Sequence, residues 1–522
     1  MKGIKIDSNL ITKKVDYSFL ENKYGKPIES DFNYDYKLED LKDTDKAAKL
    51  ILKHIDMDSY IIVVTDSDCD GINSAVVLTK GLVDILSVNP KKVITVVNRR
   101  KNGNGFNKEL VEEILKIDSR LNIGLLIAAD HGSNDNEVFK ILKEKTNMEL
   151  LITDHHTIKH YPTYADVFVN PLREDSTYDK SISGCCVAFM VIIKTYNILF
   201  KTNNYNGCNE LLPYVAVSIV TDCMEISLPY NRFLINRGLR VMNSSKYPFW
   251  DLLKQKLGIF KYTEIDIGIK IGPLVNCGNC LNNEAIVYEM LMEKDFNKLE
   301  DLINRVIELN NYRKVLTNKY ATKIIENFSN DTVVCEIIDI EEDALINGKV
   351  ASNVGGTFNK PTVIFTEIEN DVLVGSGRGI VKNLNILEIM HDINKIDNDI
   401  FLKYGGHEGA FGCNVSKPLF PKFKQLFNSL VEDKYKNIKD SDFIYPDAFI
   451  PSNAINIDLY EQQQKYAPFG INYEAPIYLS RLRLERVIPI GPICKFVFSP
   501  ITYKDRIDGI YFLMILLLPK TM

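Results

Sequence analysis

The chain has 522 residues, enough for about three domains of ordinary size. With 45% hydrophobic and 25% charged residues, its composition is that of a globular protein and excludes a disordered or fibrous one. The formal net charge of −6 argues against broad, non-specific binding to nucleic acid, so a polyanionic partner would need a local basic groove.

The sequence predicts a cytoplasmic protein without membrane contact. No apolar segment follows the N-terminal methionine, and the longest apolar run, Ile510–Leu518, is too short to span a bilayer. The ten cysteines are therefore expected to be reduced thiols. Cys277 and Cys280 have the spacing of half a zinc site, but no second pair lies at a suitable distance, so structural zinc is not expected.

The first 44 residues are polar and contain the tyrosines Tyr17, Tyr24, Tyr34 and Tyr36. They predict an arm packed on the first domain. Apolar residues at helical spacing over 43–55 then predict a helix, and the run at 60–64 predicts a strand. From this point helices and strands alternate, which is typical of an α/β domain.

The predicted strand at 60–64 is followed by an acidic loop and then by a helical run over 73–86. The loop carries aspartates at every second position, Asp66, Asp68 and Asp70. Like charges this close repel one another unless a cation lies among them. Calcium is not expected, because the twelfth position of an EF-hand counted from Asp66 is Val77. The ligand types favour Mg²⁺ or Mn²⁺, and a solvated acidic loop is the alternative.

A second strand is predicted at 93–97, followed by a loop over 98–106 with three cations and two glycines. The first of these cations is Arg99. The loop is either a flexible surface turn or a segment that lies against a phosphate backbone.

Two further strands end in polar motifs. The strand at 123–129 leads into Asp130, and the apolar run at 150–152 leads into Asp154, His155 and His156. The carboxyl ends of parallel strands form the edge where open α/β sheets bind ligands, so these residues suggest a divalent metal or phosphate site. A polar turn with one hydrogen-bonded histidine is the other interpretation.

Helices predicted at 185–196 and 213–220 follow, and the second of them leads into Asp222. One sheet edge with a neighbouring helix would therefore present six candidate ligands: Asp68, Asp70, Asp130, His155, His156 and Asp222. Their joint occurrence favours a metal site more strongly than any one of them does.

The second half of the chain begins with apolar residues at helical spacing over 283–323, which predict one or two long helices. Strands are predicted at 332–338 and 361–365. Arg378 and His407 each lie beside glycines. They are either turn residues or cations that glycines allow to approach a terminal phosphate.

The last part of the chain has strand-like segments at 477–484, 495–498 and 510–518. Its aromatic and basic residues could contact a single strand by stacking and charge, but alternating aromatics in strands also pack in cores. A barrel needs about five strands, so a reduced domain is expected here.

In this order the motifs resemble those of the DHH phosphoesterases, and within that superfamily the chain is similar to the RecJ single-strand exonucleases. The resemblance rests on the acidic loop, Asp130-His131-Gly132, Asp154-His155-His156 and Asp222. Finer matches lie at 98–105, 183–189 and 231–239, and the segments 375–378 and 405–412 resemble the DHH-associated domain.

The resemblance implies two bound metal ions, Mn²⁺ or Mg²⁺. Asp68 and Asp130 would hold one ion, while Asp70, His155 and Asp222 would hold the second, with Asp130 bridging both. Two such ions about 4 Å apart lower the pKa of a bridging water and neutralise charge on the reacting phosphate. The hydroxide would attack in line, and the 3′-oxygen would leave on the far side.

Other residues would orient the metal ligands or bind the substrate. Asp66 and Asp154 would flank the metal ligands and orient them, and His156 would contact the scissile phosphate. The resemblance assigns substrate binding to five residues: Arg99, Asn276, Ser376, Arg378 and His407.

One segment departs from the family pattern. Where the family has Arg-Leu-Asn-Ala-Ala-Gly-Arg, this chain has Leu-Val-Asn-Cys-Gly-Asn-Cys at 274–280, so that both arginines are lost and only Asn276 matches. Because arginine grips phosphate in a way other side chains do not reproduce, the grip on substrate would differ here. His131 and Lys270 are candidates to compensate.

The resemblance implies an α/β architecture in several parts. We expect an N-terminal arm at 1–44, a DHH catalytic domain with a parallel sheet at 45–282, and linking helices, one of them long, at 283–328. A smaller α/β DHH-associated domain at 329–440 and a β-rich, OB-like nucleic-acid-binding domain at 441–522 would follow.

The expected function is a 5′ to 3′ exonuclease that acts on single-stranded DNA and releases 5′-mononucleotides. By analogy its partners would be single-stranded DNA and a single-strand-binding protein or helicase. Two alternatives stay open. One is a DHH phosphodiesterase that acts on short RNA or cyclic dinucleotides, and the other is a non-catalytic DHH replication scaffold.

Overall fold

The structure is a computed structural model that describes residues 3–4, 17–27, 36–100, 103, 105–244, 246–328, 331–340, 345–368, 371–381, 384–436, 443–490, 493–500 and 507–510. The chain forms two compact units. One spans Tyr34–Lys439, and the other joins Met1–Asn33 to Asp440–Met522. Within the described ranges, we find no helix with the length and apolar character that crossing a bilayer requires.

The larger unit begins with a five-stranded parallel sheet in the order β3-β2-β4-β5-β6. Its strands are β2 (Tyr60–Thr65), β3 (Val93–Val97), β4 (Ile123–Ala129), β5 (Glu149–Thr153) and β6 (Val167–Val169). Continuous apolar runs form its inner strands because both faces of the sheet are covered by helices. The predicted strands at 60–64, 93–97, 123–129 and 150–152 are confirmed. The three-residue β6 was not predicted.

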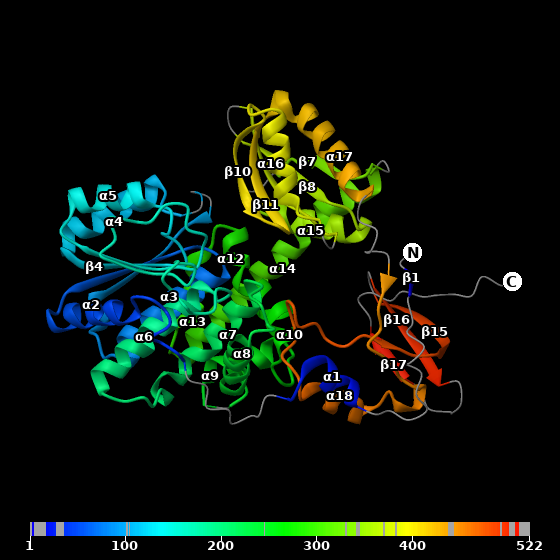
Figure 1. Ribbon diagram of the computed structural model, residues 1–522, viewed down its shortest axis with the longest axis horizontal. Helices are drawn as coiled ribbons and strands as arrows, with labels where there is room; N and C mark the ends of the chain where they lie inside the picture. The colour runs from blue at the N-terminus through cyan, green and yellow to red at the C-terminus, as the bar shows by residue number, and fades with distance from the viewer. Residues whose placement is uncertain are drawn as a thin grey trace. The chain divides into compact units, whose positions relative to one another are not determined.

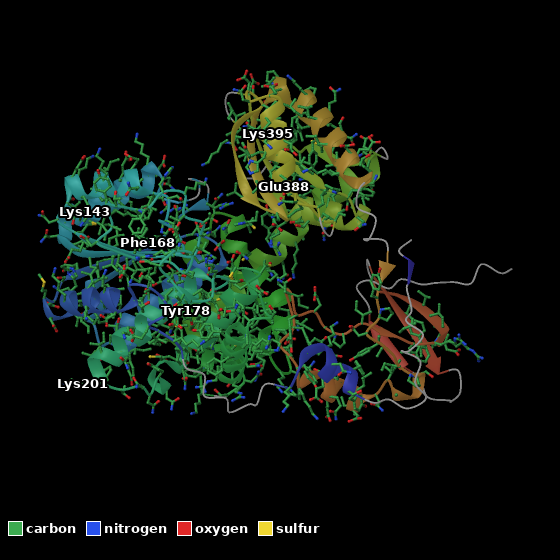
Figure 2. All side chains as sticks on the ribbon, in the orientation of Figure 1. Lys143, Phe168, Tyr178, Lys201, Glu388 and Lys395 are labelled. Carbon is green, nitrogen blue, oxygen red and sulfur yellow. The ribbon has the colours of Figure 1, made fainter. Side chains whose placement is uncertain are left out.

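Helices pack on both faces of this sheet (Figure 1). One face carries α4 (Lys108–Leu121) and α5 (Asn136–Lys145) in a cluster that also buries Phe168 of β6 (Figure 2). The other face carries α2 (Thr44–Asp56), α3 (Cys69–Lys80) and α6 (Gly184–Phe200). Side chains of β2 alternate between the faces, with Ile62 and Val64 in the first cluster.

The remaining helices of the first domain follow α6 in the chain. They are α7 (Leu212–Thr221), α8 (Pro229–Met242), α9 (Pro248–Lys256), α10 (Glu264–Asp266), α11 (Gly272–Val275) and α12 (Cys277–Cys280). Four short helices lie elsewhere along this domain: η2 (Gly81–Ile85) and η3 (Pro90–Lys92) follow α3, η5 (Asn206–Leu211) precedes α7, and η6 (Ile267–Ile271) lies between α10 and α11. Two helices then occupy the predicted linking region, α13 (Glu284–Met292) and the long α14 (Phe296–Asn327).

The second sheet of this unit is mixed, in the order β10-β11-β9-β8-β7. Its strands are β7 (Val334–Ile337), β8 (Thr362–Ile368), β9 (Val372–Arg378), β10 (Phe401–His407) and β11 (Ala410–Ser416). One face packs on α16 (Ile386–Ile396) and on the helix α17 (Phe420–Lys436), which follows η7 (Lys417–Leu419). The other packs on α14 and α15 (Asn347–Phe358). The predicted α/β architecture with a smaller second α/β domain is thus confirmed.

The smaller unit contains the first helix of the chain, α1 (Ser18–Tyr24). The hydroxyl of Tyr17 donates to Asp458 (2.6 Å), and Lys23 pairs with Asp447 (2.7 Å). The prediction that the whole N-terminal arm packs on the first domain is therefore wrong for this helix, because its polar partners lie in the C-terminal part of the chain. Tyr36 does pack on the first domain, whereas Tyr34 lies outside the described residues.

The C-terminal region is β-rich, as predicted. It holds the three-stranded antiparallel sheet β15 (Leu482–Ile490), β16 (Ile493–Pro500) and β17 (Ile507–Ile510). Short elements complete the unit: β1 (Gly3–Ile4), β12 (Phe443–Ile444), β13 (Ala448–Phe449), η8 (Ser452–Ala454), α18 (Ile457–Gln464) and β14 (Tyr478–Leu479). Most of the strand predicted at 510–518 lies outside the described residues. The domain boundaries and the OB-like character of this region stay predictions.

Candidate active site

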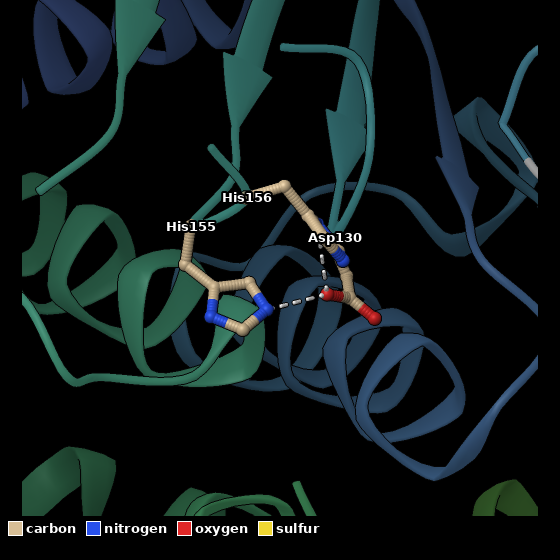
Figure 3. A group of neighbouring side chains, drawn as sticks. All are labelled: Asp130, His155 and His156. Atoms are coloured by element: carbon tan, nitrogen blue, oxygen red, sulfur yellow. Dashed lines mark ion pairs between the residues drawn. The ribbon is translucent and has the colours of Figure 1, made fainter. Parts of the chain in front are cut away.

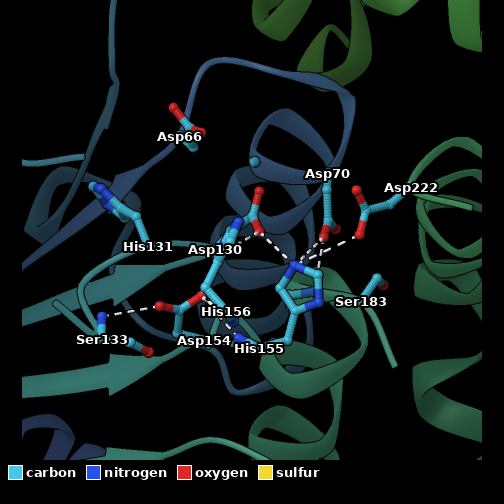
Figure 4. A network of polar contacts seen from close by, with 12 residues as sticks. Asp66, Asp70, Asp130, His131, Ser133, Asp154, His155, His156, Ser183 and Asp222 are labelled. Carbon is cyan, nitrogen blue, oxygen red and sulfur yellow. Dashed lines mark hydrogen bonds and ion pairs between the residues drawn. The ribbon is translucent and has the colours of Figure 1, made fainter. Parts of the chain in front are cut away.

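Three strands bring the polar motifs to one edge of the parallel sheet (Figure 4). The last residues of β2, β4 and β5 are register partners, since Thr65 pairs with Ala129 and Ala129 pairs with Thr153. The next residue after each strand is an aspartate, so Asp66, Asp130 and Asp154 follow at the same level. The sheet register alone therefore gathers residues that lie far apart in the sequence.

The acidic loop after β2 is held in a tight turn at the start of α3. Asp68 is the N-cap of this helix and accepts hydrogen bonds from the backbone N–H groups of Asp70 (3.0 Å) and Gly71 (3.1 Å). A Cβ atom at Gly71 would lie 2.2 Å from the backbone oxygen of Asp66, so only glycine fits this close approach. The turn keeps all three carboxylates of the loop at the sheet edge.

Asp70 is fixed by the first turn of α6. Its Oδ2 accepts from the N–H of Gly184 (2.7 Å), and its Oδ1 accepts from the N–H of Cys185 (2.9 Å) and from the hydroxyl of Ser218. The N-terminal end of a helix presents backbone N–H donors to a carboxylate, so this arrangement fixes the position of the Asp70 side chain. The motif at 183–189 was found in the sequence, but its hydrogen bonds to Asp70 were not predicted.

His155 stands at the centre of the acidic side chains. Its Nε2 atom lies 3.2 Å from Asp130 Oδ1, 3.6 Å from Asp70 Oδ2 and 3.6 Å from Asp222 Oδ2 (Figures 3 and 4). Burial lowers the pKa of His155, although the charge of Asp70 opposes this effect. The imidazole is therefore neutral near pH 7, which is the form that binds metals.

Asp130 is buried, and one of its carboxylate oxygens lacks a hydrogen-bond partner among the described residues. Its Oδ1 atom accepts no hydrogen bond from the described residues, and its backbone lies in the left-handed region with φ at 59°. Burial and the charges of the surrounding aspartates raise its pKa well above the usual range. The same causes raise the pKa of Asp222 to about 9. Such crowding is costly for carboxylates alone but suits a site that holds cations.

The ligand atoms form three groups in which all atoms lie within 4.8 Å of one another. One group, Asp70 with His155 and Asp222, is the predicted second ligand set. Another joins Asp68 and Asp130, the predicted first set, to Asp66, which was expected only to flank the ligands. The third joins Asp130 to His155 and His156. Carboxylate oxygens with some imidazole nitrogen fit Mn²⁺ or Mg²⁺.

Asp154 and His156 form a hydrogen-bonded pair beside these groups. Asp154 accepts from the N–H of Ser133 (2.9 Å), from the N–H of His155 (2.8 Å) and from Nδ1 of His156 (2.8 Å). Although burial opposes both shifts, this pairing holds the pKa of Asp154 well below its usual range and raises the pKa of His156 to about 10. His156 is thus an imidazolium near pH 7 whose side chain is 42% exposed.

Three of the predicted substrate residues share one face of the second sheet. Arg378 of β9 pairs with Ala410 of β11, which in turn pairs with His407 of β10. Ser376 lies two residues before Arg378 and therefore points to the same side. Its hydroxyl lies 3.3 Å from Nη1 of Arg378. Nothing lies within 4 Å of the Cβ position of Gly405, so the face is open beside them.

The structure favours Arg100 over Arg99 in the loop after β3. Arg99 is exposed, whereas Arg100 is half-buried and its backbone N–H donates to Glu284 (3.0 Å). Burial lowers the pKa of Arg378, and the positive charge of Arg100 lowers it further. Arg100 also opposes the rise that burial and Asp66 cause in the pKa of Asp68. Its charge therefore acts on both the acidic loop and the second sheet, which the sequence did not reveal.

The altered segment at 274–280 joins the acidic loop to the residues just before α15. Asn276 Oδ1 accepts from the N–H of Cys69 (3.0 Å), and the backbone oxygen of Cys280 accepts from the N–H of Leu345 (2.8 Å). The structure thus gives Asn276, predicted as a substrate ligand, a contact that positions the acidic loop.

The two candidates to replace the missing arginines have other partners. His131 stacks on Phe106 with ring centroids 4.5 Å apart, and its Nε2 lies 3.0 Å from the backbone oxygen of Val64. Lys270 pairs with Asp266 at 3.2 Å. The suggestion that these residues compensate is therefore not supported by their contacts.

Comparison with known families identifies both sheets of the larger unit. The model of the DHH family, N-terminal domain, matches residues 60–219, and that of the DHHA1 domain matches residues 330–433. A single-stranded-DNA-specific exonuclease RecJ from Haemophilus influenzae is 24% identical over 472 residues, which cover 86% of this chain and 79% of that protein. The RecJ of Escherichia coli is 22% identical over 500 residues, covering 90% of this chain and 84% of its own.

Solved structures show the same fold. The crystal structure of RecJ in complex with Mn²⁺ from Thermus thermophilus superposes with a TM-score of 0.75 at 21% identity, over 92% of this chain and 67% of that one. A second structure of the Thermus protein, in complex with Mg²⁺, gives a TM-score of 0.72 at 18% identity, over 96% of this chain and 70% of that one. At these identities the likeness shows a shared fold.

Proposed function

We propose that this chain, a RecJ-like member of the DHH superfamily, is a metal-dependent nuclease that degrades single-stranded DNA from the 5′ end and releases 5′-mononucleotides. The observation that carries the proposal is the convergence of Asp70, Asp130 and Asp222 on the neutral imidazole of His155. The substrate is that named for the relatives, which are single-stranded-DNA-specific exonucleases. The 5′ to 3′ direction rests on the resemblance to the RecJ family.

The ligand groups would hold two Mn²⁺ or Mg²⁺ ions, the metals present in the RecJ structures. Asp66, Asp68 and Asp130 would hold one, and Asp70, His155 and Asp222 would hold the other, with Asp130 between them. When bound, such ions activate a water and neutralise charge on the scissile phosphate.

His156 would contribute a hydrogen bond to the scissile phosphate. Its imidazolium is charged near pH 7 and is held in place by Asp154. A donor fixed in this way stabilises negative charge that develops on a phosphate oxygen, because it needs no reorganisation during the reaction. The exposed side of the ring makes it accessible to a substrate.

The open face of the second sheet would receive the strand end. Arg378, Ser376 and His407 share that face, and the guanidinium of Arg378 also donates to the backbone oxygen of Gly377 (2.8 Å). A cation fixed by hydrogen bonds beside a glycine-lined surface suits a terminal phosphate. Delivery of the strand by a single-strand-binding protein or a helicase stays part of the proposal.

The test is nucleotide release from single-stranded DNA labelled at either end, in Mn²⁺, with the wild type and three variants. Release of the 5′ label first, as a mononucleotide, supports the proposal. Asp130→Ala should abolish release, and His156→Ala should reduce it about 10²- to 10³-fold. Asp58→Ala, which changes a 75% exposed aspartate, is the matched control and should act as wild type.

The same assay separates the alternatives. Activity on dinucleotides but not on long strands would favour a phosphodiesterase for short substrates. Lack of activity on both substrates, together with no binding of Mn²⁺ in a calorimetric titration, would favour a scaffold. The complete ligand groups argue against the scaffold, because a protein without catalysis has no need for them.

A further inference from the structure

Helix α15 places a lysine beside the segment that lacks the family's arginines. The N–H of Leu345, just before this helix, donates to the backbone oxygen of Cys280 (2.8 Å). Cys280 also packs in one apolar cluster with Ile346 and Val350. Lys349 lies between these two residues in the sequence, so the first turn of α15 carries it next to the altered segment.

The side chain of Lys349 is half-buried, and no hydrogen bond or ion pair joins its ammonium group to another residue that the structure describes. Burial lowers its pKa, and the nearby groups that act on its charge are the thiols of Cys280 and Cys69 and the cations Arg313 and Arg378. The thiol of Cys280 is not ionised near pH 7, because burial raises its pKa. An ammonium group in such surroundings lacks a counter-charge, which an anionic ligand would supply.

The neighbouring cations, Arg313 and Arg378, differ in what their guanidinium groups contact. Both Nε and Nη2 of Arg313 donate to Asn310 Oδ1, at 3.1 and 2.9 Å, so this buried guanidinium is already engaged. Arg378 instead lies directly against α15, since a Cβ atom at Gly348 would be 2.6 Å from its Nη2. The absence of a side chain at 348 therefore brings the guanidinium of Arg378 close to the residue that precedes Lys349.

We propose that Lys349 binds the terminal phosphate of the substrate strand together with Arg378, and that it replaces the arginine which the family pattern has at position 280. The inference rests on the proposed function for the identity of the ligand, a phosphate monoester at a DNA end. Lysine suits this position because its flexible stem can carry a point charge to a phosphate from a half-buried backbone. Neutral thiols at 277 and 280 neither bind nor repel the phosphate.

The first experiment measures binding without metal. Fluorescence anisotropy in EDTA would compare single strands with a 5′-phosphate and with a 5′-hydroxyl, for the full-length wild type and for Lys349→Met and Lys349→Arg. Loss of a charged contact to phosphate should reduce the preference for the 5′-phosphate about tenfold or more in Lys349→Met. Lys349→Arg, which keeps the charge, should retain most of the preference.

The control is Lys395→Met on α16, a lysine that pairs with Asp392 at 3.1 Å (Figure 2). If Lys349→Met keeps the same preference for the 5′-phosphate as this control, the proposal is overturned. A structural role is tested by thermal unfolding: removal of an unpaired, half-buried charge should leave the Tm unchanged or raise it. If Lys349→Met does not fold, Lys349→Gln replaces it in the same comparison.

Turnover in Mn²⁺ separates this inference from the proposed nuclease function. Lys349→Met should raise KM for 5′-phosphorylated strands and change kcat little, since its proposed contact is with the terminal phosphate and not with the scissile one. If the wild type binds 5′-phosphorylated strands preferentially but degrades none, the nuclease function fails while the role of Lys349 stands. If the wild type degrades strands and Lys349→Met has the kinetics of Lys395→Met, only the role of Lys349 fails.

Discussion

At the scale of single residues, the crowding of carboxylates makes the metal-free protein sensitive to pH. The pKa of Asp222 rises from 3.8 to about 9 on folding, through burial and through the charges of Asp70 and Asp68. Folded Asp222 therefore keeps a proton that the unfolded chain releases, and the protein loses stability as pH rises between these values. Asp222→Asn should remove this loss and stabilise the metal-free protein by about 1 kcal/mol or more at about pH 8.

Urea unfolding in EDTA at about pH 8 and about pH 5 measures the effect, with a smaller gain expected at the lower pH. Saturating Mn²⁺ should reverse the order, because the wild type gains a ligand that the variant lacks. A variant that is less stable than wild type in EDTA at both pH values would contradict this account.

Single residues also show which parts of the candidate site could be predicted from the sequence and which could not. The candidate ligands could be found in the sequence because the apolar runs of the strands end just before aspartate or histidine, as at Asp130 and His155. Asp66 was not predicted as a ligand, because its distance in the fold from Asp68 and Asp130 cannot be read from their spacing in the sequence. Arg100 and Lys349 were not singled out, because no sequence pattern marks either residue as functional. Their surroundings exist only once the second sheet has folded against the first domain's helices.

At the scale of elements, the N-terminal end of α6 positions the metal site. A Cβ atom at Gly184 would lie 2.7 Å from Asp130 Oδ1, and the N–H of Gly184 donates to Asp70. Gly184→Ala should therefore displace the helix end, weaken Mn²⁺ binding and cost about 1 to 3 kcal/mol of stability. Calorimetric titration with Mn²⁺ and urea unfolding measure the two effects.

Gly356→Ala on α15 is the control for this substitution. Nothing lies within 4 Å of its Cβ position, and alanine is the better helix former, so a gain of up to about 1 kcal/mol is expected. Equal behaviour of the two variants would mean that Asp130 does not restrict the start of α6.

Helices and strands could be predicted from the sequence where their hydrophobic pattern extends over many residues. Continuous apolar runs gave the inner strands, and helical spacing over 283–323 indicated one or two long helices, where the structure has α13 and the long α14. The start of α3 was predicted at Asn73 but lies at Cys69, because Asp68 caps the helix and draws the acidic loop into its first turn. The strand β6 was too short to show a pattern.

At the scale of the whole molecule, the metal site belongs entirely to one of the two compact units. Every candidate ligand lies within Tyr34–Lys439, in the segments after β2, β4, β5 and α7. Binding of Mn²⁺ should tie these segments together and slow their local opening. Of the residues that the structure describes in the other unit, none belongs to these groups.

Hydrogen–deuterium exchange with and without Mn²⁺ measures this difference. Peptides over 60–72, 123–133, 149–157 and 212–223 should gain protection, because their backbones hold the ligands. Peptides over 448–464, in the other unit, should exchange at the same rate in both conditions. Uniform protection of both units would show that the metal acts on the stability of the whole chain, whereas no change at the sheet edge would place the metal elsewhere.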